Sequence, residues 1–130
     1  MVTIQKEMYL GAPLARIWDA LSDFNNVHIR VAPGFVVASK AEEGARVVTF
    51  ANGTVAREML VTCDHALHRL AYAVTGGRVT HHNASVTLQP DGKGCRLVWT
   101  TDVLPDALAP YIDAQMTAAL VAMKPALERA

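Results

Sequence analysis

Six consecutive segments between residues 35 and 103 constrain the fold of this chain more than any other feature. Each is rich in Val, Thr, Phe, Tyr or Trp, or in several of these, and these residue types favour strands. The segments are FVVASK (35–40), ARVVTFA (45–51), TVAREMLVTC (54–63), RLAYAVT (69–75), HNASVTLQ (82–89) and CRLVWTTDV (95–103). Short sequences such as Asn52-Gly53, Gly76-Gly77 and Asp91-Gly92 separate them, and such dipeptides are typical of hairpins. The pattern predicts an antiparallel meander.

A strand and a pair of short helices are expected before the meander. VTIQKEMYL (2–10) alternates as a first strand does, and Pro13 suits the first turn of a helix. That helix has apolar residues at helical spacing and ends near Asp23. A polar connection, DFNNVHIRVAPG (23–34), leads from there into the meander.

The last segment, from Pro110 to about Leu127, predicts the longest helix. One stripe of this helix is apolar and must lie on the sheet; it contains Ile112, Met116, Ala119, Leu120, Met123 and Leu127. Pro125 removes a backbone donor near the end of the segment, so the final turn is expected to be irregular.

These elements predict a single α+β domain over residues 1–130. In it, a curved antiparallel sheet of about seven strands wraps around the long C-terminal helix. The room between the helix and the sheet is then a cavity rather than a solid core. Hydrophobic residues make up 52% of the chain, slightly more than in an ordinary soluble domain, and extra apolar residues can line a cavity as well as fill a core.

Charge and composition exclude several classes of partner. Twelve basic and twelve acidic side chains give a formal net charge of zero, which argues against nucleic-acid binding and an electrostatic membrane tether. No apolar stretch is long enough for membrane insertion. The charged first strand does not resemble a secretory signal, so a cytoplasmic location is expected. The sequence leaves the oligomeric state open, a homodimer included.

Three stretches resemble one known superfamily. APLARIWDALSDF (12–24), REMLVTCDHALHRLAYAVTGG (57–77) and VWTTDVLP (98–105) are similar to the START/Bet v 1-like (SRPBCC) superfamily, and in particular to its polyketide cyclase/dehydratase-like members. The resemblance implies the helix-grip fold and a hydrophobic ligand in an internal cavity. It says less about activity, because this fold hosts lipid carriers, hormone receptors, cyclases and hydrolases.

The segment from Glu58 to Gly77 is also similar to the matching part of the plant abscisic-acid receptors. Their long gating loop does not fit between the second and third segments of the meander, where only Asn52-Gly53 connects the two. Hormone reception is therefore not implied.

Strand alternation predicts which side chains face the cavity. In the segment that contains both His81 and His82, the apolar residues share a face with His82, which places His82 inside and His81 outside. By the same test Tyr72 and Val74, like Trp99 and Thr101, face inward. In the segment 54–63 the pattern is ambiguous, and the family resemblance favours Glu58 inward. The residues predicted to contact the ligand are Leu60, Val74, Ala84, Trp99, Thr101, Met116, Ala119, Leu120 and Met123.

Assumed turn lengths predict the register of these strands. A three-residue turn at Gly76 would place Tyr72 opposite His82, and a five-residue loop after Thr62 would place Glu58 opposite Tyr72. A four-residue loop from Pro90 would place His82 opposite Thr101 and Ala84 opposite Trp99. The result is a predicted polar row of Glu58, Tyr72, His82 and Thr101 across four strands.

Such a row is open to three interpretations. A carboxylate in an apolar cavity has a raised pKa, a nearby imidazole titrates in the same range, and a tyrosine hydroxyl can bind a substrate oxygen. Glu58, His82 and Tyr72 are thus candidate catalytic residues for a cyclase or dehydratase, a lyase or isomerase type of enzyme, acting on an oxygenated polyketide, aromatic or isoprenoid. Alternatively the same groups orient a ligand or only stabilise the fold, and the protein is a carrier or sensor. A protein-interaction module, with a filled interior and an exposed apolar patch, is a third interpretation.

No cofactor or metal is expected. His81 and His82 lie on opposite faces of one strand and cannot bind the same ion, and no further ligands stand at a supporting spacing. His65 and His68 flank a turn and are expected to be solvated. His28, in the connection 23–34, is either a surface residue or part of a polar lid over the cavity entrance.

Overall fold

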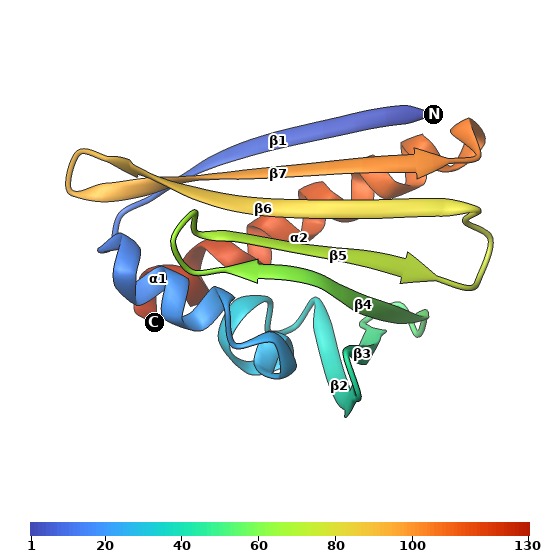
Figure 1. Ribbon diagram of the computed structural model, residues 1–130, viewed down its shortest axis with the longest axis horizontal. Helices are drawn as coiled ribbons and strands as arrows, with labels where there is room; N and C mark the ends of the chain where they lie inside the picture. Colours follow the sequence, from blue (N-terminus) through green and yellow to red (C-terminus); the bar gives the residue numbers. More distant parts are fainter.

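The computed structural model describes residues 1–130 and contains one seven-stranded antiparallel sheet with a long helix along one face (Figure 1). Its strands lie in the order β1-β7-β6-β5-β4-β3-β2. They are β1 (Val2–Leu10), β2 (Val36–Glu42), β3 (Ala45–Phe50), β4 (Val55–Asp64), β5 (Arg69–Thr75), β6 (His81–Asp91) and β7 (Gly94–Leu104). The predicted meander is therefore confirmed, and β1 joins it by pairing with β7.

The helical elements lie at the two ends of the chain. They are α1 (Leu14–Leu21), the short 3-10 and π-helical turns η1 (Phe24–Asn26) and η2 (Val27–Val31), η3 (Asp106–Leu108) and α2 (Ala109–Arg129). The α+β arrangement of a curved sheet around a long C-terminal helix is thus confirmed (Figure 1). The expected irregular final turn is wrong, because α2 continues through Pro125 to Arg129. No helix in the chain has both the length and the apolar content needed to span a membrane.

The strand register differs from the prediction by two residues in each of the three hairpins concerned. Tyr72 pairs with Ala84 rather than His82, and Ala84 pairs with Thr101 rather than Trp99. His82 lies opposite Val103, not Thr101. The loops explain the shift. The β6–β7 turn closes at Asp91 and Gly94, leaving two residues in the loop instead of the four assumed.

The same correction applies to β4. Glu58 pairs with Val74 rather than Tyr72, because β4 contains an irregularity between Leu60 and Thr62 and its turn closes at Asp64 and Arg69. A shift of two residues moves each side chain along the strand but keeps it on the same face. The predicted faces of Glu58, Tyr72 and His82 therefore survive the wrong register.

The main apolar core lies where α1 and the C-terminal half of α2 meet the sheet. Ile17, Leu97 and Leu127 are fully buried there, and Trp18 is 6% exposed. A smaller cluster around Ile4, Val103 and Met116 lies toward the other end of α2. The two clusters support the helix on the sheet at separate places.

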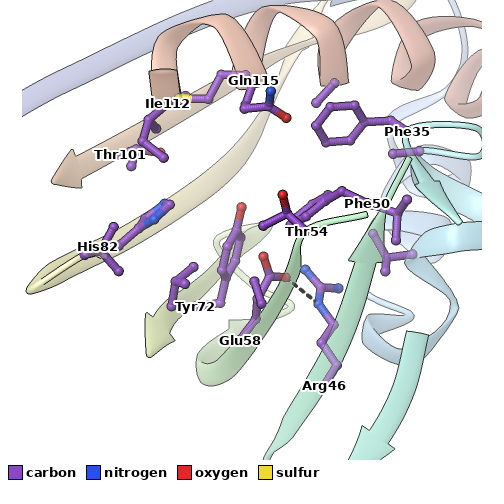
Figure 2. A pocket seen from close by; sticks show the side chains of 18 of the residues that line it. Phe35, Arg46, Phe50, Thr54, Glu58, Tyr72, His82, Thr101, Ile112 and Gln115 are labelled. Atoms are coloured by element: carbon purple, nitrogen blue, oxygen red, sulfur yellow. Dashed lines mark hydrogen bonds and ion pairs between the residues drawn. The ribbon is translucent and has the colours of Figure 1, made fainter. Parts of the chain in front are cut away.

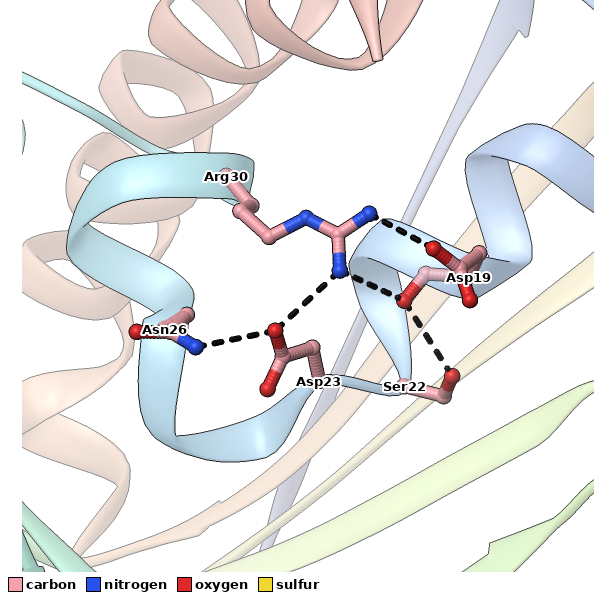
Figure 3. A network of polar contacts seen from close by, with 5 residues as sticks. All are labelled: Asp19, Ser22, Asp23, Asn26 and Arg30. Carbon is pink, nitrogen blue, oxygen red and sulfur yellow. Dashed lines mark hydrogen bonds and ion pairs between the residues drawn. The ribbon is translucent and has the colours of Figure 1, made fainter.

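A polar network holds the chain between α1 and η2 (Figure 3). Arg30 donates to the Asp19 carboxylate at 2.7 Å and to the Asp23 carboxylate at 3.1 Å. Asn26 donates to the same Asp23 carboxylate at 2.9 Å, and this hydrogen bond together with Arg30 lowers the pKa of Asp23. The network fixes the turn that brings Val27 and Val31, both buried, against the rest of the molecule.

Candidate functional site

An internal cavity of about 350 Å³ lies between the sheet and α2. It is lined by 31 residues, of which 21 are hydrophobic, so the space is apolar with a few polar side chains. Strands β3 to β7 supply one wall, α2 supplies the opposite wall, and η2 with Phe35 closes one side. This volume falls at the lower end of the range of small-molecule sites in proteins.

One end of the cavity faces solvent. The exposed lining residues lie at the β3–β4 connection, in the β5–β6 connection and on the first turns of α2; among them are Thr54, Arg78 and Tyr111. The Tyr111 hydroxyl accepts a hydrogen bond of 3.2 Å from the Asn52 amide, and the Arg78 guanidinium carbon lies 5.8 Å from the centre of the Tyr111 ring. Tyr111 thus contacts both hairpin tips at the entrance.

All four members of the predicted polar row line the cavity (Figure 2). They do not form one row, because the corrected register puts Tyr72 and Thr101 on either side of Ala84. Glu58 and His82 lie in the adjacent row of cross-strand neighbours, where Glu58 pairs with Val74 and His82 pairs with Val103. Figure 2 shows the Tyr72 hydroxyl directed into the space between the two walls.

Glu58 forms a buried ion pair with Arg46. The two residues are direct neighbours across β3 and β4, Arg46 Nε donates to Glu58 Oε1 at 2.8 Å, and the residues are 5% and 7% exposed. Arg46 Nη1 also donates to the Phe24 carbonyl at 2.7 Å, and the guanidinium lies 3.9 Å from the centre of the Phe24 ring. The premise of a lone carboxylate in an apolar cavity is therefore wrong, since a guanidinium compensates its charge.

Glu58 and His82 are not brought together. Their strands, β4 and β6, lie on either side of β5, a separation of about 10 Å between backbones at the usual strand spacing. The Glu58 carboxylate accepts its side-chain hydrogen bond from Arg46 instead. The geometry offers no carboxylate–imidazole pair that could move a proton in concert.

His82 and Tyr72 are held in their neutral forms. Burial, with a smaller effect of the charge of neighbouring His81, lowers the pKa of His82 to about 4. Burial and the negative charge of Glu58 raise the pKa of Tyr72. At neutral pH the cavity wall thus carries an uncharged imidazole and a phenol that can donate a hydrogen bond.

Two buried polar atoms on β7 lack a hydrogen-bond partner. They are Trp99 Nε1 and Thr101 Oγ1, and Thr101 is only 1% exposed. The Trp99 indole is close enough to the Tyr72 hydroxyl to lower the pKa of that hydroxyl. The contact nevertheless does not have the geometry of a hydrogen bond, and Trp99 Nε1 has no acceptor. Both residues line the cavity, while the two atoms themselves are buried.

Five of the predicted contact residues besides Glu58, Tyr72, His82 and Thr101 also line the cavity: Val74, Trp99, Met116, Ala119 and Met123. Four other predicted contacts do not line it. Leu60 is 37% exposed, because the irregularity after it turns β4 away. Ala84 is fully buried between Tyr72 and Thr101.

Leu120 and His28 do not line the cavity either. Leu120 packs against the main core instead of the cavity. His28 lies in η2 with its Nδ1 buried and without a partner, but the cavity wall is formed there by its neighbours Val27 and Val31. The π-helical turn, which the sequence did not reveal, decides which of these side chains point inward.

Of the two turn histidines, His65 is exposed, as predicted, and His68 is half-buried; both contact Trp18. His65 Nδ1 accepts a hydrogen bond of 3.1 Å from Trp18 Nε1, and His68 lies edge-on to the same indole with ring centres 5.5 Å apart. No group of three or more His, Cys, Asp or Glu side chains in the chain could hold a metal ion.

Arg46, Phe35, Phe50 and Gln115 line the cavity and were not predicted (Figure 2). A signal for Arg46 exists in the sequence. Alternation in ARVVTFA puts Arg46 on the same face as Val48 and Phe50, and the two apolar residues mark that face as the inner one.

Comparison with known proteins agrees with this architecture. The family model described as polyketide cyclase/dehydrase and lipid transport matches residues 1–128. The chain belongs to this family. The comparison with curated proteins found no match.

Solved structures share the fold of this family member. An uncharacterised protein from Bacillus thuringiensis superimposes with a TM-score of 0.84 at 14% identity, covering 97% of this chain and 98% of that one. XoxI from Bacillus cereus gives a TM-score of 0.83 at 14% identity, with 99% and 94% covered. A protein from Thermobifida fusca gives 0.80 at 24% identity, with 98% and 91% covered. At these identities the likeness shows the fold alone.

Proposed function

We propose that the protein binds a small, hydrophobic, oxygenated molecule in the cavity between the sheet and α2. The observation that carries the proposal is a space of about 350 Å³ with a mostly apolar wall, into which Tyr72, His82 and Thr101 present polar groups. An apolar wall favours an apolar ligand body, and a few fixed polar groups favour oxygen atoms at defined places. Polyketides, aromatics and isoprenoids have this chemistry.

Met116 and Met123 suit this role. Both line the cavity from α2 and are nearly fully buried. Methionine side chains are unbranched and adapt to irregular shapes. The helix wall can therefore adjust to ligands of somewhat different outline.

Acid–base catalysis of the cyclase/dehydratase type is the second candidate, and the neutral His82 near a protonated Tyr72 favours it. Tyr72 would donate a hydrogen bond to a substrate carbonyl, and His82 would accept a proton. Two observations weigh against it. Glu58 is paired with Arg46, and an imidazole with a pKa of about 4 is a weak base. We therefore place binding, as in a carrier or sensor, ahead of catalysis.

Two adjacent alanines on α2 provide a matched test of binding. Ala119 lines the cavity and is 2% exposed, whereas Ala118 faces solvent. The probe is 1-aminoanthracene, an uncharged fluorophore whose emission rises in apolar surroundings. Ala119→Leu fills part of the cavity and is expected to weaken probe binding at least about tenfold, while Ala118→Leu leaves it unchanged. Equal binding by both variants, with unchanged thermal unfolding, would place the probe elsewhere and refute the proposal.

Turnover separates the two candidate functions. A native mass spectrum of the purified protein would identify a co-purifying ligand by its added mass. His82→Gln and Tyr72→Phe would then be compared with the parent protein for binding and conversion of that ligand. Conversion that is lost while binding persists supports catalysis. Conversion by neither parent nor variants supports a carrier or sensor.

The cytoplasm is the proposed site of action, without a nucleic-acid partner. The zero formal net charge of the chain supports the second part. A homodimer is compatible with this function and is tested by light scattering of the purified protein.

A further inference from the structure

The two unused donors of β7 specify the ligand more closely than the cavity volume does. Trp99 and Thr101 both line the cavity, and their Nε1 and Oγ1 atoms are buried and lack a hydrogen-bond partner in the protein. They stand two residues apart on one strand, so their side chains share the inner face. A buried polar group without a hydrogen bond costs free energy. The fold tolerates that cost twice at one place.

The chemistry of these atoms defines their complement. An indole N–H only donates, and a threonine hydroxyl can donate one hydrogen bond. The Tyr72 hydroxyl lies near the indole, and Tyr72 and Thr101 are the two cross-strand neighbours of the small Ala84. Tyr72, Trp99 and Thr101 thus bring three hydrogen-bonding groups to one part of the cavity wall, around the buried Ala84.

The charges around this point are balanced. Arg46 is the cation on the wall nearest to Tyr72, with its guanidinium 5.4 Å from that ring, and Glu58 already neutralises it. His82 is uncharged at neutral pH, since its pKa is about 4. An anionic group placed here would lose its hydration without gaining an unpaired positive charge.

We propose that Trp99 and Thr101 form a recognition site for an uncharged acceptor oxygen, such as a ketone, ester or lactone carbonyl, at the inner end of the ligand. This inference rests on the proposed binding function and specifies it. The ligand enters with its carbonyl oxygen directed at β7 and its apolar body along α2. Trp99 and Thr101 then determine specificity for the oxygen rather than contributing only apolar contact.

Two probes of nearly identical shape test the site. 2-Acetylnaphthalene carries a carbonyl where 2-isopropenylnaphthalene carries a C=CH₂ group, and 2-naphthoate supplies the anion. Binding is followed by the two indole ¹⁵N–H signals in an NMR titration. The Trp99 signal is expected to move downfield with the ketone and much less with the alkene. Trp18 serves as an internal reference, because its N–H already donates to His65.

Thr101→Val removes the hydroxyl and keeps the shape. The variant is expected to lose about fivefold to tenfold in ketone affinity, the effect of one hydrogen bond, with alkene affinity unchanged. Thr101→Ser retains the hydroxyl and should retain the preference for the ketone even if it is less stable. Naphthoate should bind more weakly than the ketone.

The outcomes separate the two proposals. If none of the three probes binds, the binding function fails and the recognition site fails with it. If ketone and alkene bind equally and the Trp99 signal does not distinguish them, the cavity binds ligands but the recognition site is wrong. Naphthoate binding more tightly than the ketone would overturn the uncharged character of the site.

Discussion

Arg46 and Glu58 face each other across β3 and β4 and form an ion pair of 2.8 Å that is almost completely buried. Through its bond to the Phe24 carbonyl and its contact with the Phe24 ring, Arg46 also joins η1 to the sheet. The pair therefore connects the cavity wall to the segment that leads into η2. This structural role of the pair accounts for the burial of the Glu58 carboxylate, so a catalytic role is not needed to explain it.

Breaking this pair should strongly destabilise the protein. Arg46→Met leaves the Glu58 carboxylate buried without a counter-charge, and Glu58→Leu leaves the Arg46 guanidinium in the same state. Each change is expected to lower the free energy of unfolding by about 3 kcal/mol or more, measured by urea denaturation.

The double variant Arg46→Met/Glu58→Leu is the control. It removes both charges, so its loss should be clearly smaller than the sum of the two single losses. Additive losses would mean that the two side chains stabilise the fold independently and that the ion pair is of little consequence.

Side-chain alternation predicted the faces of the strands, whereas the register depended on loop lengths. Glu58, Tyr72, His82 and Thr101 all line the cavity as expected, because a two-residue slip preserves the face. The pairing of Tyr72 with Ala84 could not be predicted, since a turn sequence such as Gly76-Gly77 does not fix where the ladder resumes. The catalytic hypothesis required Glu58 and His82 to lie directly opposite Tyr72, and neither pairing occurs.

Irregular backbone limited the prediction elsewhere. The deviation after Leu60 and the π-helical turn around His28 leave no periodic trace in the sequence, and each misplaced a predicted ligand contact. In contrast, helical spacing placed Met116, Ala119 and Met123 correctly on the cavity wall, although Leu120 of the same stripe packs against the main core.

His82 should make the stability of the protein depend on pH between about 4 and 6.5. Its pKa falls from 6.5 to about 4 on folding, so within this window the unfolded chain binds the proton and the folded chain does not. Stability therefore rises with pH across the window and is lost as pH falls, by up to about 3 kcal/mol. Urea denaturation between pH 4 and 7.5 measures the slope.

His82→Gln should flatten this slope, and His81→Gln should reduce it only slightly, because the charge of His81 is the smaller cause of the shift. Folding lowers the pKa values of Asp23 and Glu128 from 3.8 and 4.5. These two carboxylates therefore change the stability of the protein mainly at the acid end of the window. An unchanged slope in His82→Gln would show that another group titrates there.

Arg30 provides a contrast with Arg46, since its two ion pairs lie at the surface (Figure 3). Its carboxylate partners Asp19 and Asp23 remain solvated when it is removed. Arg30→Ala is expected to cost less than about 1 kcal/mol, and the cost should shrink in 1 M salt as charges are screened. A loss as large as that of Arg46→Met would indicate that the network in Figure 3 controls the whole segment 23–31.

Gly94 is required by a close approach of two backbones. A Cβ atom at this position would collide with the Leu10 carbonyl oxygen and with the Tyr9 ring, where the end of β1 meets the start of β7. Gly94→Ala must therefore separate paired strands, and we expect a loss of about 3 kcal/mol or more in the free energy of unfolding.

Gly92, in the same turn, has a φ of +58°, and a Cβ atom added there would meet no other atom within 4 Å. Gly92→Ala should cost only about 1–2 kcal/mol, the strain of the left-handed conformation. If Gly94→Ala proved no worse than Gly92→Ala, β1 would not pack against the β6–β7 hairpin as tightly as described.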